Sequence, residues 1–258
     1  MIFAIDMGNT NIVIGCVDDK KTYFVERIST DKKKTALEYA VSFKTVFDLY
    51  GINPGDIDGA ILSSVVPPLQ SVIKEAVKMI TGLEPIVVGP GVKTGLNIKM
   101  DNPKTVGADM IVDAVAAIEM FGAPLIVIDM GTATTLSVID DKGSYVGGVI
   151  IPGVRLSMEA LASSAAQLFR VSLDTPKKVI GKNTIDCIQN GLMVGNACGI
   201  DGLIDRIEEE LGYTTTKVAT GGLAKKIIPL CRKEITLVDD LLLRGLMIIY
   251  DRNVSKKG

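Results

Sequence analysis

One strand–turn–strand pattern occurs twice in this chain and limits its fold more than any other feature. The first copy reads Ile-Asp-Met-Gly-Asn-Thr at residues 5–10, and the second reads Ile-Asp-Met-Gly-Thr-Ala-Thr at residues 128–134. In both copies an apolar run precedes the turn, and a second apolar run follows it and ends in Asp-Asp-Lys, at residues 18–20 and 140–142. Internal similarity of this kind predicts the duplication of a domain. The alternative is two chance segments, since Asp-x-Gly turns are common.

Strand and helix signals alternate along the chain and restart after residue 121. The 258 residues, of which 47% are hydrophobic, suffice for two domains with their own cores. We therefore predict two related α/β domains, residues 1–121 and 122–258. Apolar runs and periodicities predict strands at residues 2–6, 11–17, 23–28, 60–66, 85–88, 125–129, 135–140, 145–151 and 217–220 and one ending at Leu237, and helices at residues 36–50, 69–80, 106–121, 153–166, 185–211, 223–230 and 241–250.

Composition argues against several classes of function. Lys and Arg number 28 against 30 Asp and Glu, and no basic stripe occurs, so we expect no nucleic-acid partner. No apolar run reaches membrane-spanning length and no basic leader precedes the first strand, so we expect a cytoplasmic protein without a membrane partner. The four cysteines form no C-x-x-C pair, which favours a reduced compartment and no zinc site. The chain has no histidine, so any proton transfer falls to a carboxylate, Lys, Tyr or Cys.

The two repeated turns have the residue types of phosphate-binding hairpins. A glycine in a tight turn lets the backbone approach a ligand closely, and successive turn N–H groups bind anions. The small polar residues beside Gly8 and Gly131 add donors without filling the space. Asp6 and Asp129 end the preceding strands, and a carboxylate there repels phosphate unless a cation such as hydrated Mg²⁺ intervenes. Two such hairpins facing each other would hold a polyphosphate from both sides.

A third segment extends this interpretation to a nucleotide. Residues 218–223 run from a strand through Gly221 and Gly222 toward a helix. Paired glycines leave room for a flat purine against the backbone, while a plain strand–helix turn is the alternative for this segment alone. Competing phosphate motifs fail, because residues 89–94 lack P-loop spacing and no Gly-x-Gly-x-x-Gly follows the first strand. We therefore expect an ATP site.

A set of short motifs extends over nearly the whole chain. It comprises Asp6-Met-Gly-Asn-Thr10, Ser63-Ser-Val-Val-Pro-Pro68, Gly89-Pro-Gly-Val-Lys-Thr-Gly-Leu96, Asn102-Pro103, Gly107-Ala-Asp109, Asp129-Met-Gly-Thr-Ala-Thr-Thr135, Gly147-Gly148, Pro152-Gly153 and Lys182-Asn-Thr184. Taken together, these motifs resemble those of type III pantothenate kinases in the acetate and sugar kinase/Hsp70/actin superfamily, and the set is far more specific than any one member. The resemblance implies an α/β fold of two duplicated ribonuclease-H-like (actin-like ATPase) domains with an ATP cleft between them.

The resemblance implies an activity and its cofactors. The reaction would be ATP-dependent phosphorylation of pantothenate to 4′-phosphopantothenate, the first step of coenzyme A biosynthesis. Mg²⁺ and a monovalent cation, K⁺ or NH₄⁺, would take part. The family also implies a homodimer with the active site near the interface. The glycine-interrupted helix expected at residues 185–211 is a candidate dimer surface, with internal packing as the equal alternative.

The resemblance further implies a role for each matching residue. Asp109 would be the catalytic base, Asp6 would hold Mg²⁺ through water, and Asp129 would bind the monovalent cation. Taken alone, Asp109 reads equally well as an acid favoured by a helix N-terminus. The implied ATP and phosphate contacts are Asp6, Gly8, Asn9, Thr10, Thr132, Ala133, Thr134, Gly221 and Gly222, and the implied pantothenate contacts are Met100, Gly107, Ala108, Asp109, Met110 and Thr184.

Two positions depart from the family pattern on the substrate side. The family usually has Arg where this chain has Met110, and Tyr where it has Met100. Losing the Arg removes a charge-assisted hydrogen bond to the pantothenate carboxylate, worth about 1.5–3 kcal/mol. Lys99, Lys104 or Arg155 are candidates for a replacement cation. The departures leave two alternatives open: a non-catalytic nucleotide-binding regulatory relative, like Baf-type transcriptional activators, and a kinase for a related small alcohol.

Overall fold

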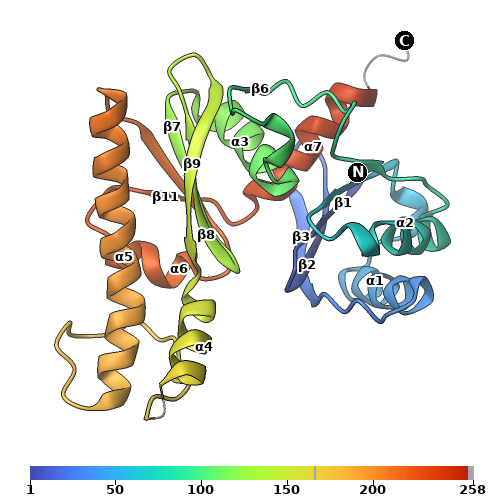
Figure 1. Ribbon diagram of the computed structural model, residues 1–258. Coiled ribbons are helices and arrows are strands. Elements are labelled where there is room, and N and C mark those ends of the chain that lie inside the picture. The colour runs from blue at the N-terminus through green and yellow to red at the C-terminus, as the bar shows by residue number, and fades with distance from the viewer. Residues whose placement is uncertain (166, 255–258) are drawn as a thin grey trace. The chain divides into compact units, whose positions relative to one another are not determined.

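The computed structural model describes residues 1–165 and 167–254, which form two compact units by their contacts (Figure 1). Unit 1 comprises Met1–Leu96, Asn102–Met120 and Asp240–Gly258, and unit 2 comprises Asn97–Asp101 and Phe121–Asp239. The contacts thus group the end of the chain with its beginning. The domain division at residues 121 and 122 stays a prediction.

Unit 1 is built on a five-stranded sheet in the order β3-β2-β1-β4-β5. Strands β1 to β3 form an antiparallel meander, whereas β4 is parallel to β1 and β5 is parallel to β4. The strands are β1 (Ile2–Met7), β2 (Asn11–Val17), β3 (Thr22–Ser29), β4 (Gly59–Ser64) and β5 (Ile86–Val87).

Helices cover both faces of this sheet. Helices α1 (Ala36–Tyr50) and α2 (Pro67–Thr81) lie side by side (Figure 1). Because side chains alternate along a strand, Phe3 and Ile5 of β1 pack in the core with these two helices. Ile2 and Ala4 pack in a separate core with α3 (Ala108–Phe121) and α7 (Leu241–Val254). The first helix begins at a capping box, in which the Thr35 and Glu38 side chains each accept a hydrogen bond from the other residue's backbone N–H.

Unit 2 repeats the topology of unit 1. Its sheet has the order β11-β10-β7-β8-β9-β6, so β9-β8-β7-β10-β11 matches β3-β2-β1-β4-β5 strand for strand. The antiparallel meander and the parallel partner of its first strand recur as well. The predicted duplication is confirmed. The strands are β6 (Asn97–Ile98), β7 (Leu125–Met130), β8 (Ala133–Ile139), β9 (Ser144–Pro152), β10 (Thr216–Thr220) and β11 (Thr236–Leu237).

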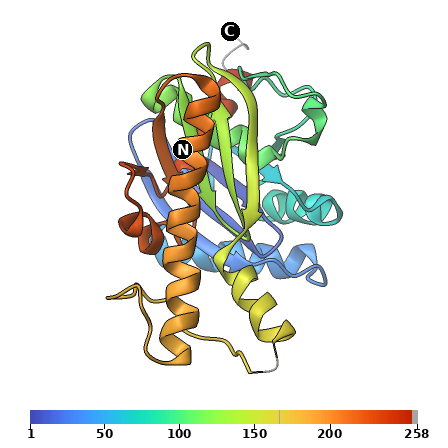
Figure 2. The ribbon, with the colours of Figure 1, turned by 60° about the vertical axis from the view of Figure 1, so that its left-hand side comes forward.

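One long helix covers a face of the second sheet. Helix α5 (Thr184–Leu211) runs along the sheet, and α4 (Val154–Ser164) follows β9 (Figure 2). Ile126 and Ile128 of β7 share a core with residues of α5 and of α6 (Ala224–Ile227). Among the described residues, no helix is long and apolar enough to cross a membrane.

Several element boundaries differ from those predicted. A short 3₁₀ helix at Pro103–Thr105 delays the start of α3, so α3 begins at Ala108 rather than at residue 106. The helix predicted at residues 223–230 divides into α6 and a 3₁₀ turn at Ile228–Leu230, because Pro229 lacks the N–H that a continuing helix needs. The helix predicted at residues 153–166 ends at Ser164, and Ala166 lies outside the described residues. A third 3₁₀ turn occupies Pro54–Asp56.

Candidate functional site

The turn between β1 and β2 places polar groups beside a buried carboxylate. Asp6, one residue before the end of β1, is only 8% exposed, whereas Asn9 and Thr10 in the turn are exposed. The Gly8 N–H donates to the Asn11 carbonyl at 3.0 Å, which closes the turn. A Cβ on Gly8 would approach that same carbonyl to 3.0 Å, so glycine suits the turn. The hairpin has the form expected of an anion-binding turn.

The turn between β7 and β8 repeats this arrangement in unit 2. The Gly131 N–H donates to the Ala133 carbonyl at 3.0 Å, and the Gly153 N–H donates to the Thr132 carbonyl at 3.1 Å. A Cβ on Gly153 would come within 2.4 Å of the Thr132 carbonyl oxygen, so only glycine packs here. Thr132 is exposed, Ala133 is half-buried, and Thr134 is buried within β8.

The paired glycines of unit 2 lie against its strand-end aspartate. β10 is parallel to β7, and Thr220, the residue before Gly221, pairs with Asp129. Gly221 has a φ of 102°, and a Cβ there would lie 2.6 Å from Asp129 Oδ1. Both properties require glycine. Unit 2 therefore brings Asp129, the second hairpin and the paired glycines together, as the sequence predicts for a nucleotide site.

Asp109 lies in the first turn of α3 with its carboxylate half-buried. Its Oδ1 accepts the Met110 N–H at 2.9 Å. Burial raises the pKa of the Asp109 carboxyl, although backbone hydrogen bonds from Met110 and from Asp109 itself oppose the rise. A Cβ on Gly107 would lie 2.4 Å from Asp109 Oδ1, so the carboxylate uses space that a larger residue at position 107 would fill. A half-buried carboxylate with a raised pKa is a stronger proton acceptor than an ordinary aspartate.

The predicted substrate residues are divided between the two units. Gly107, Ala108, Asp109 and Met110 are consecutive in unit 1, whereas Met100 and Thr184 belong to unit 2. Thr184 is the exposed first residue of α5, and the Met100 sulfur lies 3.9 Å from where a Cβ on Gly147 would be.

Lys99, one candidate for a replacement cation, is already paired. Its Nζ lies 2.8 Å from Asp140 Oδ2, and the Asp140 side chain is 13% exposed. Despite partial burial, that bond and backbone N–H groups hold the pKa of Asp140 below its usual value. This leaves Lys104 and Arg155 as the more available of the three predicted cations.

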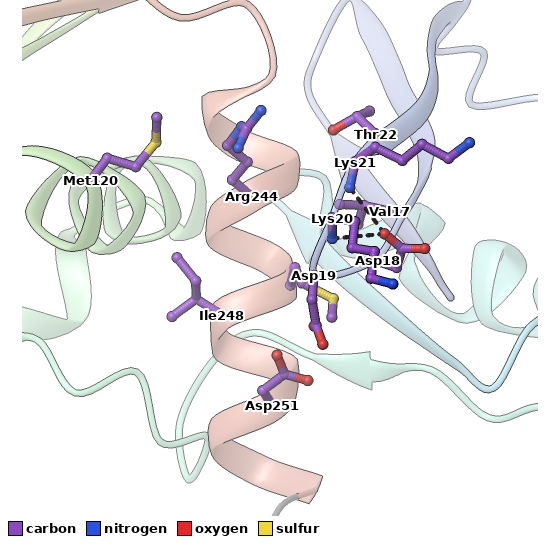
Figure 3. Close-up of a pocket in the computed structure, with 11 residues that line it drawn as sticks. Val17, Asp18, Asp19, Lys20, Lys21, Thr22, Met120, Arg244, Ile248 and Asp251 are labelled. Atoms are coloured by element: carbon purple, nitrogen blue, oxygen red, sulfur yellow. Dashed lines mark hydrogen bonds between the residues drawn. The ribbon is translucent and has the colours of Figure 1, made fainter.

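A hollow of about 200 Å³ in unit 1 holds none of the predicted residues (Figure 3). It lies between the β2–β3 turn and α7, with Asp19, Lys21, Arg244 and Asp251 among its lining. That turn follows the C-terminal end of β2, whereas the Gly8 hairpin precedes its N-terminal end, about 20 Å away at the rise of a strand. The hollow is therefore separate from the Gly8 hairpin.

A buried hydroxyl lies beside each strand-end aspartate. β4 is parallel to β1 with Ser63 paired to Asp6, and β10 is parallel to β7 with Thr220 paired to Asp129. Ser63 is fully buried and Thr220 is 5% exposed. The sequence motifs assign neither hydroxyl a role. What could have identified them is their equivalent position in the two units, since each lies on the strand next to the repeated aspartate.

Relatives of known family match the chain over its whole length. A profile of the type III pantothenate kinase family matches residues 2–206. The type III pantothenate kinase of Halalkalibacterium halodurans is 46% identical over 255 residues, which cover 98% of this chain and 100% of the relative. That of an Exiguobacterium species is 48% identical over 254 residues, covering 98% and 99%.

Solved structures support the fold. A conserved Baf family transcriptional activator from Campylobacter jejuni superposes with a TM-score of 0.60 at 19% identity, over 98% of this chain and 100% of that one. MreB 5 of Spiroplasma citri, bound to AMPPNP, superposes with a TM-score of 0.54 at 11% identity, over 99% and 97%. At these identities the likeness concerns the fold alone, which is that of the actin-like ATPases.

Proposed function

This chain belongs to the type III pantothenate kinase family, and we propose on that premise that it transfers the γ-phosphoryl group of ATP to the primary hydroxyl of pantothenate. The product is 4′-phosphopantothenate, and the reaction is the first step of coenzyme A biosynthesis. The observation that carries this proposal is the full-length match to relatives of that name at 46% and 48% identity.

Asp109 is the base that accepts the proton of the pantothenate hydroxyl. Its raised pKa makes it a better proton acceptor than an ordinary carboxylate. The start of α3 places it where Gly107 leaves room for the carboxylate and Ala108 packs against the core of unit 1. The hydroxyl oxygen, as it loses its proton to Asp109, attacks the γ-phosphorus, and ADP leaves.

The two hairpins hold the phosphates. Phosphoryl transfer depends mostly on positioning and on neutralising charge, so turn amides and small hydroxyls can supply much of the catalysis. In unit 1 these come from Gly8, Asn9 and Thr10. In unit 2 they come from residues 132–134, while Gly221 and Gly222 let the purine approach the backbone.

The strand-end aspartates fit the two cations of the family. Among the described residues no three or more carboxylate or thiol groups gather into a cage, which suits Mg²⁺ because that ion usually binds one or two carboxylates and keeps several waters. Asp6 would hold Mg²⁺ through water, and Asp129, whose Oδ1 lies beside Gly221 of the glycine turn, would hold K⁺ or NH₄⁺. When bound, these ions neutralise the negative charge that develops on the transferring phosphoryl group.

On the substrate side, Met100 and Met110 stand where the family usually has Tyr and Arg. We propose that Lys104 or Arg155 meets the pantothenate carboxylate, because Lys99 is paired with Asp140. The proposal also includes a homodimer with its active site near the interface, and a cytoplasmic location. Both rest on the membership of the family.

The experiment is ADP release by the purified protein with ATP, Mg²⁺ and K⁺, with and without pantothenate, in the wild type and in Asp109→Asn. Pantothenate-dependent release that collapses in the variant supports the kinase and its base. ATP binding without pantothenate-dependent release of ADP would contradict the proposal.

A further inference from the structure

The hydroxyl of Ser63 is buried in unit 1 without a partner. The side chain is fully buried, and among the described residues its Oγ has no hydrogen-bond partner. Buried polar atoms in native proteins are nearly always hydrogen-bonded, so each exception calls for an explanation. Replacing Ser63 by an apolar residue of similar size would avoid the cost of an unpaired hydroxyl. A group that forms its hydrogen bond only in a ligand-bound state is one such explanation.

The sheet register places Ser63 beside Asp6. The two residues are partners across the parallel strands β1 and β4. Ile2 and Ala4 of β1 and Ile61 of β4 all pack in the core under α3 and α7. Since side chains alternate along a strand, Asp6 and Ser63 point to that same face. A serine hydroxyl changes its direction by rotation about one bond, among three staggered positions. The Asp6 carboxylate thus lies one strand away on the same face, where the Ser63 hydroxyl can rotate toward it.

The second half of the chain preserves this pair. Asp129 and Thr220 are partners across the parallel strands β7 and β10. Ile128 and Ala219, their neighbours in sequence, pack together in the core of unit 2, so Asp129 and Thr220 share the opposite face. The duplicated domain thus places a hydroxyl opposite the strand-end aspartate in both copies. A group that served packing alone would have no need to remain a hydroxyl in both.

We infer that Ser63 is a positioning residue whose hydroxyl donates to the Asp6 carboxylate when that carboxylate holds the hydrated Mg²⁺ of bound ATP. This inference rests on the cation role of Asp6 in the proposed function. Groups that hydrogen-bond a metal ligand hold it in its ligating orientation, and their loss typically lowers metal affinity 10- to 100-fold. Ser63 would do this for Asp6 from the neighbouring strand.

The test measures ATP binding by calorimetry over a range of Mg²⁺ concentrations, for the wild type, Ser63→Ala and Ser63→Thr. For Ser63→Ala we expect the half-saturating Mg²⁺ concentration to rise about tenfold or more, with ATP affinity in the absence of Mg²⁺ unchanged. The melting temperature of its ligand-free form should equal or exceed that of the wild type, because the deleted hydroxyl had no partner. Ser63→Thr should keep the half-saturating Mg²⁺ concentration of the wild type, since Thr220 shows that this fold accepts threonine at the equivalent position.

Ser137→Ala is the matched control. Ser137 is also a buried hydroxyl, but its Oγ has a partner, Tyr145 Oη, at 3.3 Å. This variant should lower the ligand-free melting temperature and leave Mg²⁺ dependence unchanged. If Ser63→Ala behaves like Ser137→Ala, or fails to fold, the hydroxyl is structural and the inference is overturned. Pantothenate is absent from the assay, so the result for Ser63 would hold even if pantothenate proved not to be the substrate.

Discussion

The Oδ1 atom of Asp109 occupies the space in which a side chain on Gly107 would begin. A Cβ at position 107 would lie 2.4 Å from that oxygen, well inside van der Waals contact. The obstructing atom is the tip of a side chain, which can rotate away, and no backbone atom is in the way. The glycine therefore matters more to the direction of the carboxylate than to the fold.

Gly107→Ala should consequently fold but lose activity. The added methyl group displaces the Asp109 carboxylate, and a misplacement of about 1 Å can cost about 100-fold in rate. We expect kcat to fall by roughly that factor, with a melting temperature close to that of the wild type. Steady-state kinetics beside a thermal melt provide the measurement. Gly89→Ala is the control, because a Cβ there meets nothing within 4 Å. Wild-type kcat in Gly107→Ala would contradict the assigned base.

Asp109→Asn should separate activity from stability. General-base catalysis contributes about 10²–10⁴-fold, so we expect kcat to fall within that range. The folded pKa of Asp109 lies above its unfolded value, so this group favours folding at low pH, loses that contribution as the pH rises through the folded pKa, and opposes folding once it is ionised. The neutral amide removes that opposition and still accepts the Met110 N–H.

The melting temperature of Asp109→Asn at pH 7 should therefore equal or exceed that of the wild type. Each kcal/mol regained corresponds to about 2–4 °C for a chain of this size. A variant that is both inactive and markedly less stable would point to a structural role for the carboxylate.

The pH dependence of the wild type should report the same group. A base works only when deprotonated, so kcat/KM should fall as the pH drops through the pKa of Asp109. Because burial raises that pKa, the acid limb should lie above the ordinary aspartate value of about 3.9. The limb is measured between pH 4 and 8 on enzyme shown to remain folded. A limb at or below the ordinary value would argue against Asp109 as the base.

Lys217→Met should destabilise unit 2. Lys217 Nζ lies 2.7 Å from Glu208 Oε1, and the two side chains are 15% and 13% exposed. Burial raises the pKa of Glu208, but the hydrogen bonds from Lys217 and Thr215 lower it by more, so the net pKa lies below its usual value. Removing the cation leaves a largely buried carboxylate uncompensated, so we expect a loss of about 2–4 kcal/mol in the free energy of unfolding.

The pH dependence of that loss has a definite sign. A carboxylate whose folded pKa is depressed contributes stability above its unfolded pKa and loses it as the pH falls through the folded value. The difference between wild type and Lys217→Met should therefore shrink below about pH 4. Lys44→Met, which breaks an exposed pair with Asp48, is the control and should change stability by less than about 0.5 kcal/mol. Denaturant melts at pH 7 and at about pH 3 would make the comparison.

The repeated turns were predictable because their information is local. Asp6 and Asp129 each precede a glycine that the turn requires, and both halves adopt the strand order that a duplication predicts. The start of α3 was missed by two residues, since the 3₁₀ turn at Pro103–Thr105 competes with the helix over the same stretch. The pairing of Ser63 with Asp6 depends on a register between strands more than fifty residues apart, which no local pattern encodes. The engagement of Lys99 by Asp140 was unpredictable for the same reason.

The membership of α7 in unit 1 has a consequence for biosynthesis. Ile2, Ala4 and Ile61 share their core with Leu243, Leu246 and Ile249 of this last helix. The helix spans Leu241–Val254, so a ribosome has made nearly the whole chain before that apolar face can be covered. The first unit to be translated thus completes its core only after residue 241, whereas unit 2 ends at Asp239. A nascent chain arrested before residue 241 would expose this face, and with it a surface for chaperones or for aggregation.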